Sequence, residues 1–271
     1  MKKFVYFFGN KQTEGDASQK FLLGGKGANL AEMSKIGIPV PPGFTISTEV
    51  CKYFYDNNKK YPETLNKEVS TNLKKLENST GKKFGDTKNP LLVSVRSGAA
   101  SSMPGMMDTI LNLGLNEKVV DSIAKSTNNP RFAWDSYRRF IQMYGNVVEN
   151  IDHEKFEHII AEVKAKKAIK EDVDMTAPDW QEVVSGYKKI FKIEKNREFP
   201  DDAQTQLWGA IGAVIGSWNN ARAITYRKLN HIDESKVFGT AVNIQSMVFG
   251  NLGVDSGTGV AFTRNPATGE N

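Results

Sequence analysis

Leu92-Val93-Ser94-Val95-Arg96-Ser97-Gly98 is the stretch of sequence that decides the fold. A short apolar run rich in valine, opening just after a proline, is typical of a buried β-strand. The apolar part ends in Arg96, and small residues continue to Ser102. A guanidinium group at the end of a buried strand is costly unless it meets an anion or a carboxylate. The stretch therefore predicts either a structural ion pair or an anion-binding site.

The next segment is a loop of small residues and methionines. It reads Ser101-Ser102-Met103-Pro104-Gly105-Met106-Met107-Asp108-Thr109, and we expect it to have few options for core packing. Such a composition favours a flexible lid whose amides and hydroxyls close over phosphate groups. The pair Met106-Met107 is as consistent with packing as with function.

A glycine-rich segment, Gly24-Gly25-Lys26-Gly27, lies nearer the N-terminus and is expected to open a helix over residues 28–36. Glycines let backbone amides approach an anion closely, a helix N-terminus adds partial positive charge, and lysine supplies a mobile cation. The segment is not a P-loop, because the spacer and the Ser/Thr after the lysine are missing. Taken alone, it is more typical of a plain turn than of an anion-binding site.

The remaining segments predict an α+β fold rather than a doubly wound sheet. Residues 116–198 are rich in Lys and Glu and predict a helical insert. Other helices are expected from Thr48, within residues 62–83 and over residues 201–226, and further strands over residues 4–8, 44–48, 240–249 and 259–263, the last pairing with the one before it.

Composition excludes several classes of protein. The chain has 271 residues, of which 39% are hydrophobic and 25% charged, which is ordinary for a globular protein. No apolar run approaches the roughly 20 residues that span a bilayer, so no membrane association is expected. The net charge of +5 is spread out and forms no arginine-rich block, so no nucleic-acid partner is expected either. A single cysteine gives no internal disulfide, and the expected location is cytoplasmic.

Histidine and cysteine give no catalytic signal. His153 and His158 flank Glu154 at a spacing one residue too long for a zinc-protease motif. We therefore expect these two histidines and His231 at the surface. Cys51 lacks a neighbour that would activate it and is expected to be a small core residue. No catalytic residue and no metal ligand are predicted within the chain.

Three segments taken together resemble the nucleotide-binding domain of the pyruvate phosphate dikinase family. They are residues 22–33 around the glycine-rich segment, residues 92–114 around Arg96 and the methionine-rich loop, and residues 245–266, which include Gln245-Ser246-Met247-Val248-Phe249-Gly250-Asn251. Residues 129–140 also resemble that family's helical insert. The resemblance runs over nearly the whole chain.

This resemblance implies an ATP-grasp fold with four parts. Residues 1–115 would form the first lobe with its phosphate loop, and residues 116–198 the helical insert. Residues 199–239 would return to the first lobe, and residues 240–271 would begin a second lobe that is incomplete.

The resemblance also implies an ATP site. Lys26 and Arg96 match cationic ligands of the phosphates, with Gly105 and Thr109 of the loop closest to the nucleotide. The adenine pocket would be lined by Gln245 and Val248, and Arg264 would add a phosphate contact. Mg²⁺ would accompany ATP, with its protein ligands expected beyond Asn271.

The reaction implied by the family converts ATP, phosphate and pyruvate into AMP, pyrophosphate and phosphoenolpyruvate through a phosphohistidine. The phosphohistidine and pyruvate-binding domains are expected elsewhere in a longer, homodimeric protein of which this chain would be a truncated part. The isolated chain is then expected to bind ATP weakly and to catalyse no turnover. Two alternatives are a fragment of phosphoenolpyruvate synthase and a non-catalytic nucleotide-binding module.

Overall fold

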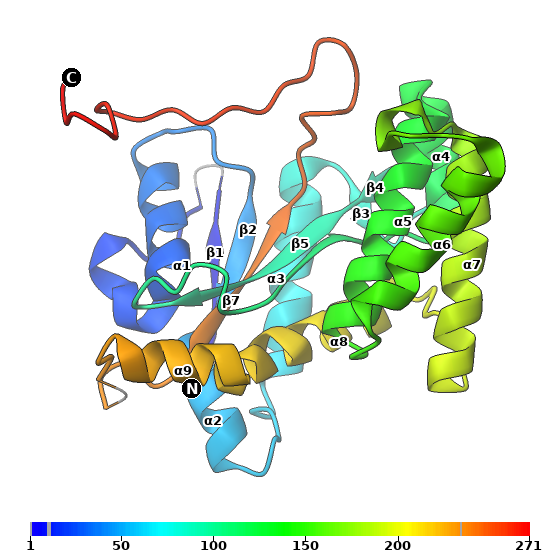
Figure 1. Cartoon of the computed structure of the whole chain (residues 1–271). Coiled ribbons are helices and arrows are strands. Elements are labelled where there is room, and N and C mark those ends of the chain that lie inside the picture. Colours follow the sequence, from blue (N-terminus) through cyan, green and yellow to red (C-terminus); the bar gives the residue numbers. More distant parts are fainter. Residues whose placement is uncertain (1, 10–11, 234) are drawn as a thin grey trace.

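The computed structural model describes residues 2–9, 12–233 and 235–271, and its centre is a five-stranded sheet with helices on both faces (Figure 1). The strand order is β1-β2-β7-β5-β6, and every neighbouring pair is antiparallel. The strands are β1 (Val5–Phe8), β2 (Gly43–Ile46), β5 (Val93–Ala99), β6 (Thr109–Leu113) and β7 (Thr240–Ser246). This mixed architecture of helices and an antiparallel sheet agrees with the predicted α+β class.

The two faces of the sheet differ sharply in polarity. Side chains alternate along a strand, so residues in register across the sheet share a face. One row joins Phe44, Ile244 and Val95, all fully buried. The adjacent row joins Thr45 to Asn243, Asn243 to Arg96, and Arg96 to Thr109. The apolar row faces the core, and the polar row faces the opposite side.

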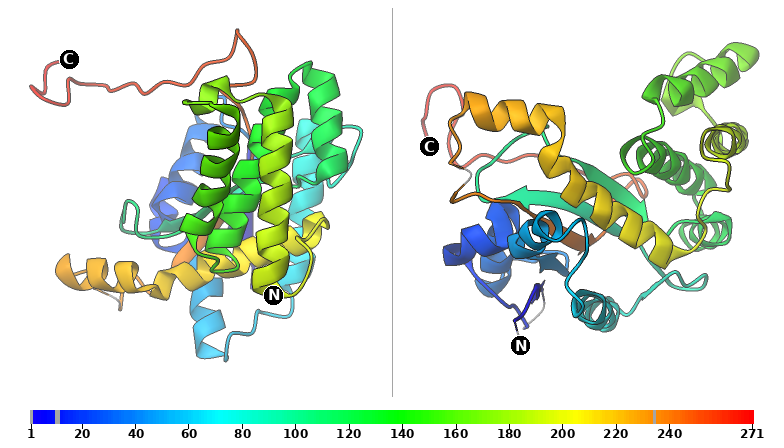
Figure 2. Two further views of the ribbon diagram at one scale, coloured as in Figure 1. Left: turned by 45° about the vertical axis from the view of Figure 1, so that its right-hand side comes forward. Right: turned by 90° about the horizontal axis from the view of Figure 1, so that it is seen from below.

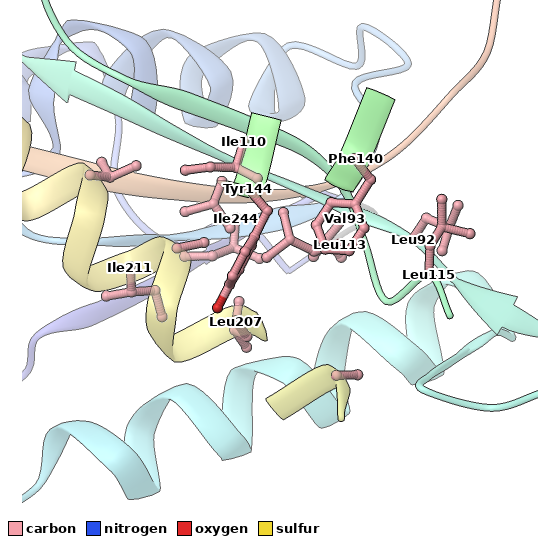
Figure 3. Close-up of a cluster of buried hydrophobic side chains, with 14 of the residues drawn as sticks. Leu92, Val93, Ile110, Leu113, Leu115, Phe140, Tyr144, Leu207, Ile211 and Ile244 are labelled. Atoms are coloured by element: carbon pink, nitrogen blue, oxygen red, sulfur yellow. The ribbon is translucent and has the colours of Figure 1, made fainter. Parts of the chain in front are cut away.

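The apolar face packs against α8 (Ala203–Gly216) and α5 (Pro130–Val147). Figure 3 shows Leu207 and Ile211 of α8 facing strand residues that include Ile244, with Phe140 and Tyr144 of α5 beside them. Full burial of each such side chain contributes about 2 kcal/mol to folding. Farther along the sheet, α3 (Leu65–Thr80) packs on β1 and β2, and α2 (Thr48–Asp56) contacts β7.

The predicted helical insert contains α5 and three further α-helices, α4 (Glu117–Thr127), α6 (His153–Lys167) and α7 (Ala177–Lys195). It also contains the short helix η2 (Asp172–Asp174). Within it, the Arg138 guanidinium lies 2.8 Å from the Asp135 carboxylate and stacks on Trp180. Two short parallel strands, β3 (Lys83–Phe84) and β4 (Pro90–Leu91), connect α3 to β5. Figure 2 shows the four α-helices standing together beside the sheet.

The position of β7 contradicts the prediction that residue 240 begins a second lobe. This strand lies at the centre of the sheet, paired with β2 and β5, so residues 240–246 belong with the strands of residues 1–115. The predicted strand over residues 259–263 is also wrong, because the described residues after Ser246 form no helix or strand. Val260 and Phe262 are exposed there, so their alternation with small residues does not mark a buried strand.

The helix predicted over residues 201–226 is wrong as a single element. It divides into α8, the short helix η3 (Ser217–Asn219) and α9 (Ala221–Leu229). Asn220 stops the first axis and begins the second, since its backbone is extended and its Oδ1 accepts a hydrogen bond from the Ala223 amide at 2.7 Å. None of the described helices is both long and apolar enough to cross a bilayer.

The helix predicted over residues 28–36 begins earlier. After η1 (Ala17–Gln19), α1 runs from Lys20 to Lys35 and contains a break at Gly24, where φ is 69° and ψ is 164°. A Cβ at Gly24 would lie 1.7 Å from the carbonyl oxygen of Gly98. The glycine is therefore required twice, by its backbone conformation and by the contact of α1 with β5.

Substitution of Gly24 by alanine is expected to lower the free energy of unfolding by about 3 kcal/mol or more, because the new methyl group must push α1 away from β5. Gly37 is the matched control: its φ is also positive, at 86°, but no atom lies within 4 Å of a Cβ built there. Gly37→Ala should cost only about 1 kcal/mol. Urea unfolding measures both, and equal losses would contradict the packing argument.

Candidate functional site

A cavity of about 580 Å³ lies between α1 and the β5–β6 loop (residues 100–108). Helix α1 contributes Lys20, Gly25, Lys26 and Asn29 to its lining. The rest of its polar wall comes from the end of β5, from Ser101 to Gly105 of the loop, and from Thr109. We call this space the first cavity.

Arg96 lies beside the first cavity, and its charge has no partner in the part of the chain that the structure describes. It is the fourth residue of β5 rather than the last, and it lies in register with Thr109, which lines the cavity. Its side chain is half-buried, and it makes no hydrogen bond or ion pair with any described residue. Partial burial lowers the pKa of this guanidinium. The predicted alternative of a structural ion pair is therefore excluded among the described residues.

Lys26 is the second cation at this place. Its Nζ donates a hydrogen bond to the Ser97 carbonyl at 2.9 Å and has no carboxylate partner among the residues described. The residue keeps access to solvent, yet desolvation of the ammonium group and then the nearby positive charge of Arg96 lower the pKa of Lys26. Two cations that repel each other and lack a counter-charge are matched to an anionic ligand.

The break in α1 adds backbone donors to this cationic wall. Because Gly24 is not helical, the helix restarts at Gly25, and the first amides of the restarted helix have no intrahelical acceptor. Gly25 and Lys26 both line the first cavity. The partial positive charge of a helix N-terminus therefore lies at the cavity wall.

The β5–β6 loop is less free than its composition predicted. Met103 is buried in the core, and Met106 and Met107 pack partly against it. Gly105, by contrast, is exposed with φ at 72° and has no atom within 4 Å of a Cβ built there. The methionines thus anchor a loop whose tip is exposed.

A second cavity of about 480 Å³ lies at the other end of β5 and β7. Its lining includes Leu92, Phe132, Val248 and Phe249, which make much of its wall apolar. Leu92 immediately precedes β5, whereas Ala99 at the end of β5 lines the first cavity. At about 3.3 Å per strand residue, the two cavities are separated by about 20 Å along β5.

The residues predicted from sequence divide into three groups. Lys26, Gly105 and Thr109 line the first cavity with Arg96 beside them, and Val248, which is 71% exposed, lines the second. Gln245 lines neither cavity, and its side-chain amide donates to the Pro41 carbonyl at 2.9 Å. Arg264 also lines neither; it is exposed and donates to the Gly269 carbonyl at 3.2 Å.

Sequence reasoning missed Lys20 and Asn29 of the first cavity and Phe132 of the second. Lys20 makes no hydrogen bond or ion pair with a described residue. No local signal identified it, because it precedes the break in α1. Asn29 lies three residues after Lys26 on the same helix, so the 3.6-residue period was a usable signal for that side chain.

Metal and nucleophile candidates are sparse. The described part of the chain contains no group of three or more His, Cys, Asp or Glu residues that could hold a metal ion. Cys51 is a buried residue of α2, as predicted, and burial raises the pKa of its thiol to about 11. His153, His158 and His231 are exposed, also as predicted. The arrangement is suited to holding a polyanion.

Comparison with known proteins identifies close relatives. The family described as pyruvate phosphate dikinase, AMP/ATP-binding domain, matches residues 20–68 and 58–271. Pyruvate, phosphate dikinase of Rhizobium meliloti (strain 1021) is 54% identical over 270 residues, which cover 100% of this chain and 30% of the relative. The enzyme of Clostridium symbiosum is 54% identical over 271 residues, which cover 100% of this chain and 30% of that enzyme. The chloroplastic enzyme of Flaveria trinervia is 53% identical over 269 residues, with coverage of 99% and 28%. The chain thus spans less than a third of the length of these relatives.

Replacement of Arg96 by methionine should leave the free energy of unfolding within about 0.5 kcal/mol of the original value or raise it, because no partner is lost. The pKa of Lys26 should rise, since a repelling charge is removed, and NMR titration of the lysine side chain measures it. A lysine with a lowered folded-state pKa destabilises the fold below that pKa, and stability recovers as pH rises toward the unfolded value. In the Arg96→Met variant, the free energy of unfolding should therefore rise less steeply with pH over this range.

Arg138→Met is the control for this variant, because Arg138 pairs with the buried carboxylate of Asp135. Its loss should cost about 3 kcal/mol. A comparable loss in Arg96→Met would show that Arg96 has a structural partner.

Proposed function

This chain belongs to the pyruvate phosphate dikinase family, and we propose that its two cavities receive the two ends of one ATP molecule. The match to the AMP/ATP-binding domain covers most of the chain and supports this proposal. In the proposed arrangement, the triphosphate occupies the first cavity and the purine the second. The nucleotide then lies along the polar face of the sheet, past Arg96.

The proposal rests on the charge of Arg96, which no described residue neutralises. A half-buried guanidinium without a carboxylate destabilises the folded protein unless a ligand supplies the counter-charge. Phosphate oxygens match the planar donor array of arginine and can accept two hydrogen bonds from it. The pKa of Lys26 is lowered by desolvation and by Arg96, and the same anion would raise it again.

The second cavity suits the purine because its wall is largely apolar. Leu92 and Phe132 offer surfaces on which a base can stack, and Val248 lies on the segment that leaves β7. Backbone amides and carbonyls of that segment would recognise the edge of the adenine. Gln245 would then act through its neighbours, because its own amide is committed to Pro41.

For the full-length protein we propose the dikinase reaction. A histidine nitrogen attacks the β-phosphorus of ATP, the bond to the α-phosphate oxygen breaks and AMP leaves. Inorganic phosphate then takes the γ-phosphoryl group as pyrophosphate, and the phosphohistidine transfers its group to the enolate oxygen of pyruvate. This chain would supply positioning and charge neutralisation, which are the main requirements of phosphoryl transfer.

Further parts of the proposal concern the surroundings of this domain. We propose that the nucleotide-binding region has an ATP-grasp fold and acts in a cytoplasmic homodimer with phosphohistidine and pyruvate-binding domains. ATP would carry Mg²⁺, but the described residues offer no cluster that fits the ion. We propose that the full-length protein supplies the ligands of this ion.

The alternative interpretations are not favoured. The matching family and the relatives described above are dikinases rather than phosphoenolpyruvate synthases. These relatives are likewise not purely regulatory nucleotide-binding modules. Arg264 stays a predicted phosphate contact, although its exposed position in the chain after β7 gives the prediction no direct support.

Calorimetric titration of this chain with ATP tests the proposal. We expect a dissociation constant in the micromolar range or weaker, and no dikinase turnover. Arg96→Met should weaken binding at least tenfold, as expected for the loss of a charge-assisted contact worth about 1.5 kcal/mol or more. Binding should also weaken as salt concentration rises.

Lys125→Met is the control, because it removes one positive charge from α4 outside both cavities. It should leave ATP affinity within a factor of about two. The proposal fails if the original chain binds no ATP at millimolar concentration, or if both variants lose affinity equally.

A further inference from the structure

The β5–β6 loop is held from the side opposite α1 by the start of α9. The Met106 carbonyl accepts a hydrogen bond from the Asn220 side-chain amide at 3.1 Å and a second from Arg222 Nε at 3.2 Å. Figure 1 shows the loop projecting between α1 and α9. The cavity wall is thus tied to an element that does not itself line the cavity.

The same tether reaches Asp108 at the end of the loop. Its amide donates to Ser217 Oγ at 3.2 Å, and that hydroxyl donates to the Val214 carbonyl of α8 at 2.7 Å. The Asp108 carboxylate forms an ion pair with Arg222. The second half of the loop is therefore fixed at both Met106 and Asp108 by the η3–α9 junction.

The first half of the loop, residues 101–105, faces the first cavity. Met103 is buried, whereas Gly105 at the tip is exposed and has no atom within 4 Å of a Cβ built there. Its backbone can keep one orientation toward a ligand only if the residues that follow are held. Ordering a free loop at the moment of binding would otherwise weaken affinity.

We propose that Asn220 is a positioning residue that holds the β5–β6 loop in its phosphate-binding conformation. This inference rests on the proposed function of the first cavity. The two halves of the Asn220 amide divide the task. Oδ1 accepts from the Ala223 amide and caps α9, while Nδ2 donates to Met106 and holds the loop. The start of α9 and the loop are therefore fixed by one side chain.

The geometry assigns this effect to the outer phosphates. With the purine in the second cavity, the α-phosphate lies nearest Arg96 and the β- and γ-phosphates reach the loop. AMP lacks the two outer phosphates, so its affinity should not depend on the tether. The ratio of ATP to AMP affinity is then a measure of loop position that general destabilisation would not change.

Asn220→Asp separates the two tasks of the side chain. Aspartate caps a helix as well as asparagine does, but its carboxylate cannot donate to the Met106 carbonyl. We expect ATP binding by this chain to weaken about tenfold. This is the loss expected when the hydrogen bond to the Met106 carbonyl is replaced by two oxygen atoms that repel each other. AMP affinity should stay within about twofold. The thermal midpoint should fall by only about 2–4 °C, because the cap is retained and a single loop hydrogen bond is lost.

Asn116→Asp is the matched control. Asn116 caps α4 through Oδ1, which accepts from the Val119 amide at 3.0 Å, and its Nδ2 donates to the Asp201 carbonyl at 3.1 Å. It lines neither cavity, so the same chemical change there should leave the ATP-to-AMP affinity ratio unaltered.

Two outcomes overturn the inference while leaving the proposed function intact. In the first outcome, the Asn220→Asp variant binds ATP as tightly as the original chain. In the second, it loses affinity for ATP and AMP equally. Failure of the proposed function looks different, because the original chain and the Asn116 variant would then bind no ATP at all.

Discussion

The close approach of α1 to β5, where Gly24 meets the carbonyl of Gly98, is the contact on which the first cavity depends. A side chain at Gly24 would separate the helix from the sheet, and Lys26 could no longer reach the Ser97 carbonyl at 2.9 Å. The same contact forces the break in α1 and so exposes the amides at Gly25. One steric requirement thus sets both the lysine and the backbone donors of the site.

The fold tolerates the charges of this site because the two faces of the sheet differ: one packs in the core and the other carries polar groups. The apolar face buries Val95, Ile244 and their neighbours against α8 and α5, and this burial stabilises the fold. The other face is then free to carry polar groups. There Thr45 donates a hydrogen bond at 2.9 Å to Asn243, which is 1% exposed, and Asn243 is in register with Arg96. The polar row therefore positions charges without contributing to the core.

Arg96 and Lys26 are held where each makes the charge of the other less favourable. Neither has a carboxylate partner among the residues described, and the pKa of Lys26 is lowered by desolvation and by Arg96. A polyphosphate relieves both effects at once, so part of the electrostatic cost of folding is returned as binding free energy. The contrast with Arg138, which pairs with Asp135, shows that this chain satisfies a buried arginine where no ligand is needed.

The sequence by itself determined the features that depend on near neighbours. A valine-rich apolar run predicted the strand around Val95, and composition predicted the loop after Ser97. The motifs identified the family and the cavity residues Lys26 and Thr109. Only the tertiary structure decided what depends on distant segments: the central place of β7, the break between α8 and α9, the absence of a partner for Arg96 among the described residues, and the Asn220 tether. Side-chain periodicity records which face of an element is buried, but it does not record which other element covers that face. The approach of Asn220 to Met106 is set by the packing of α8 on the sheet, and no local pattern in either segment contains it.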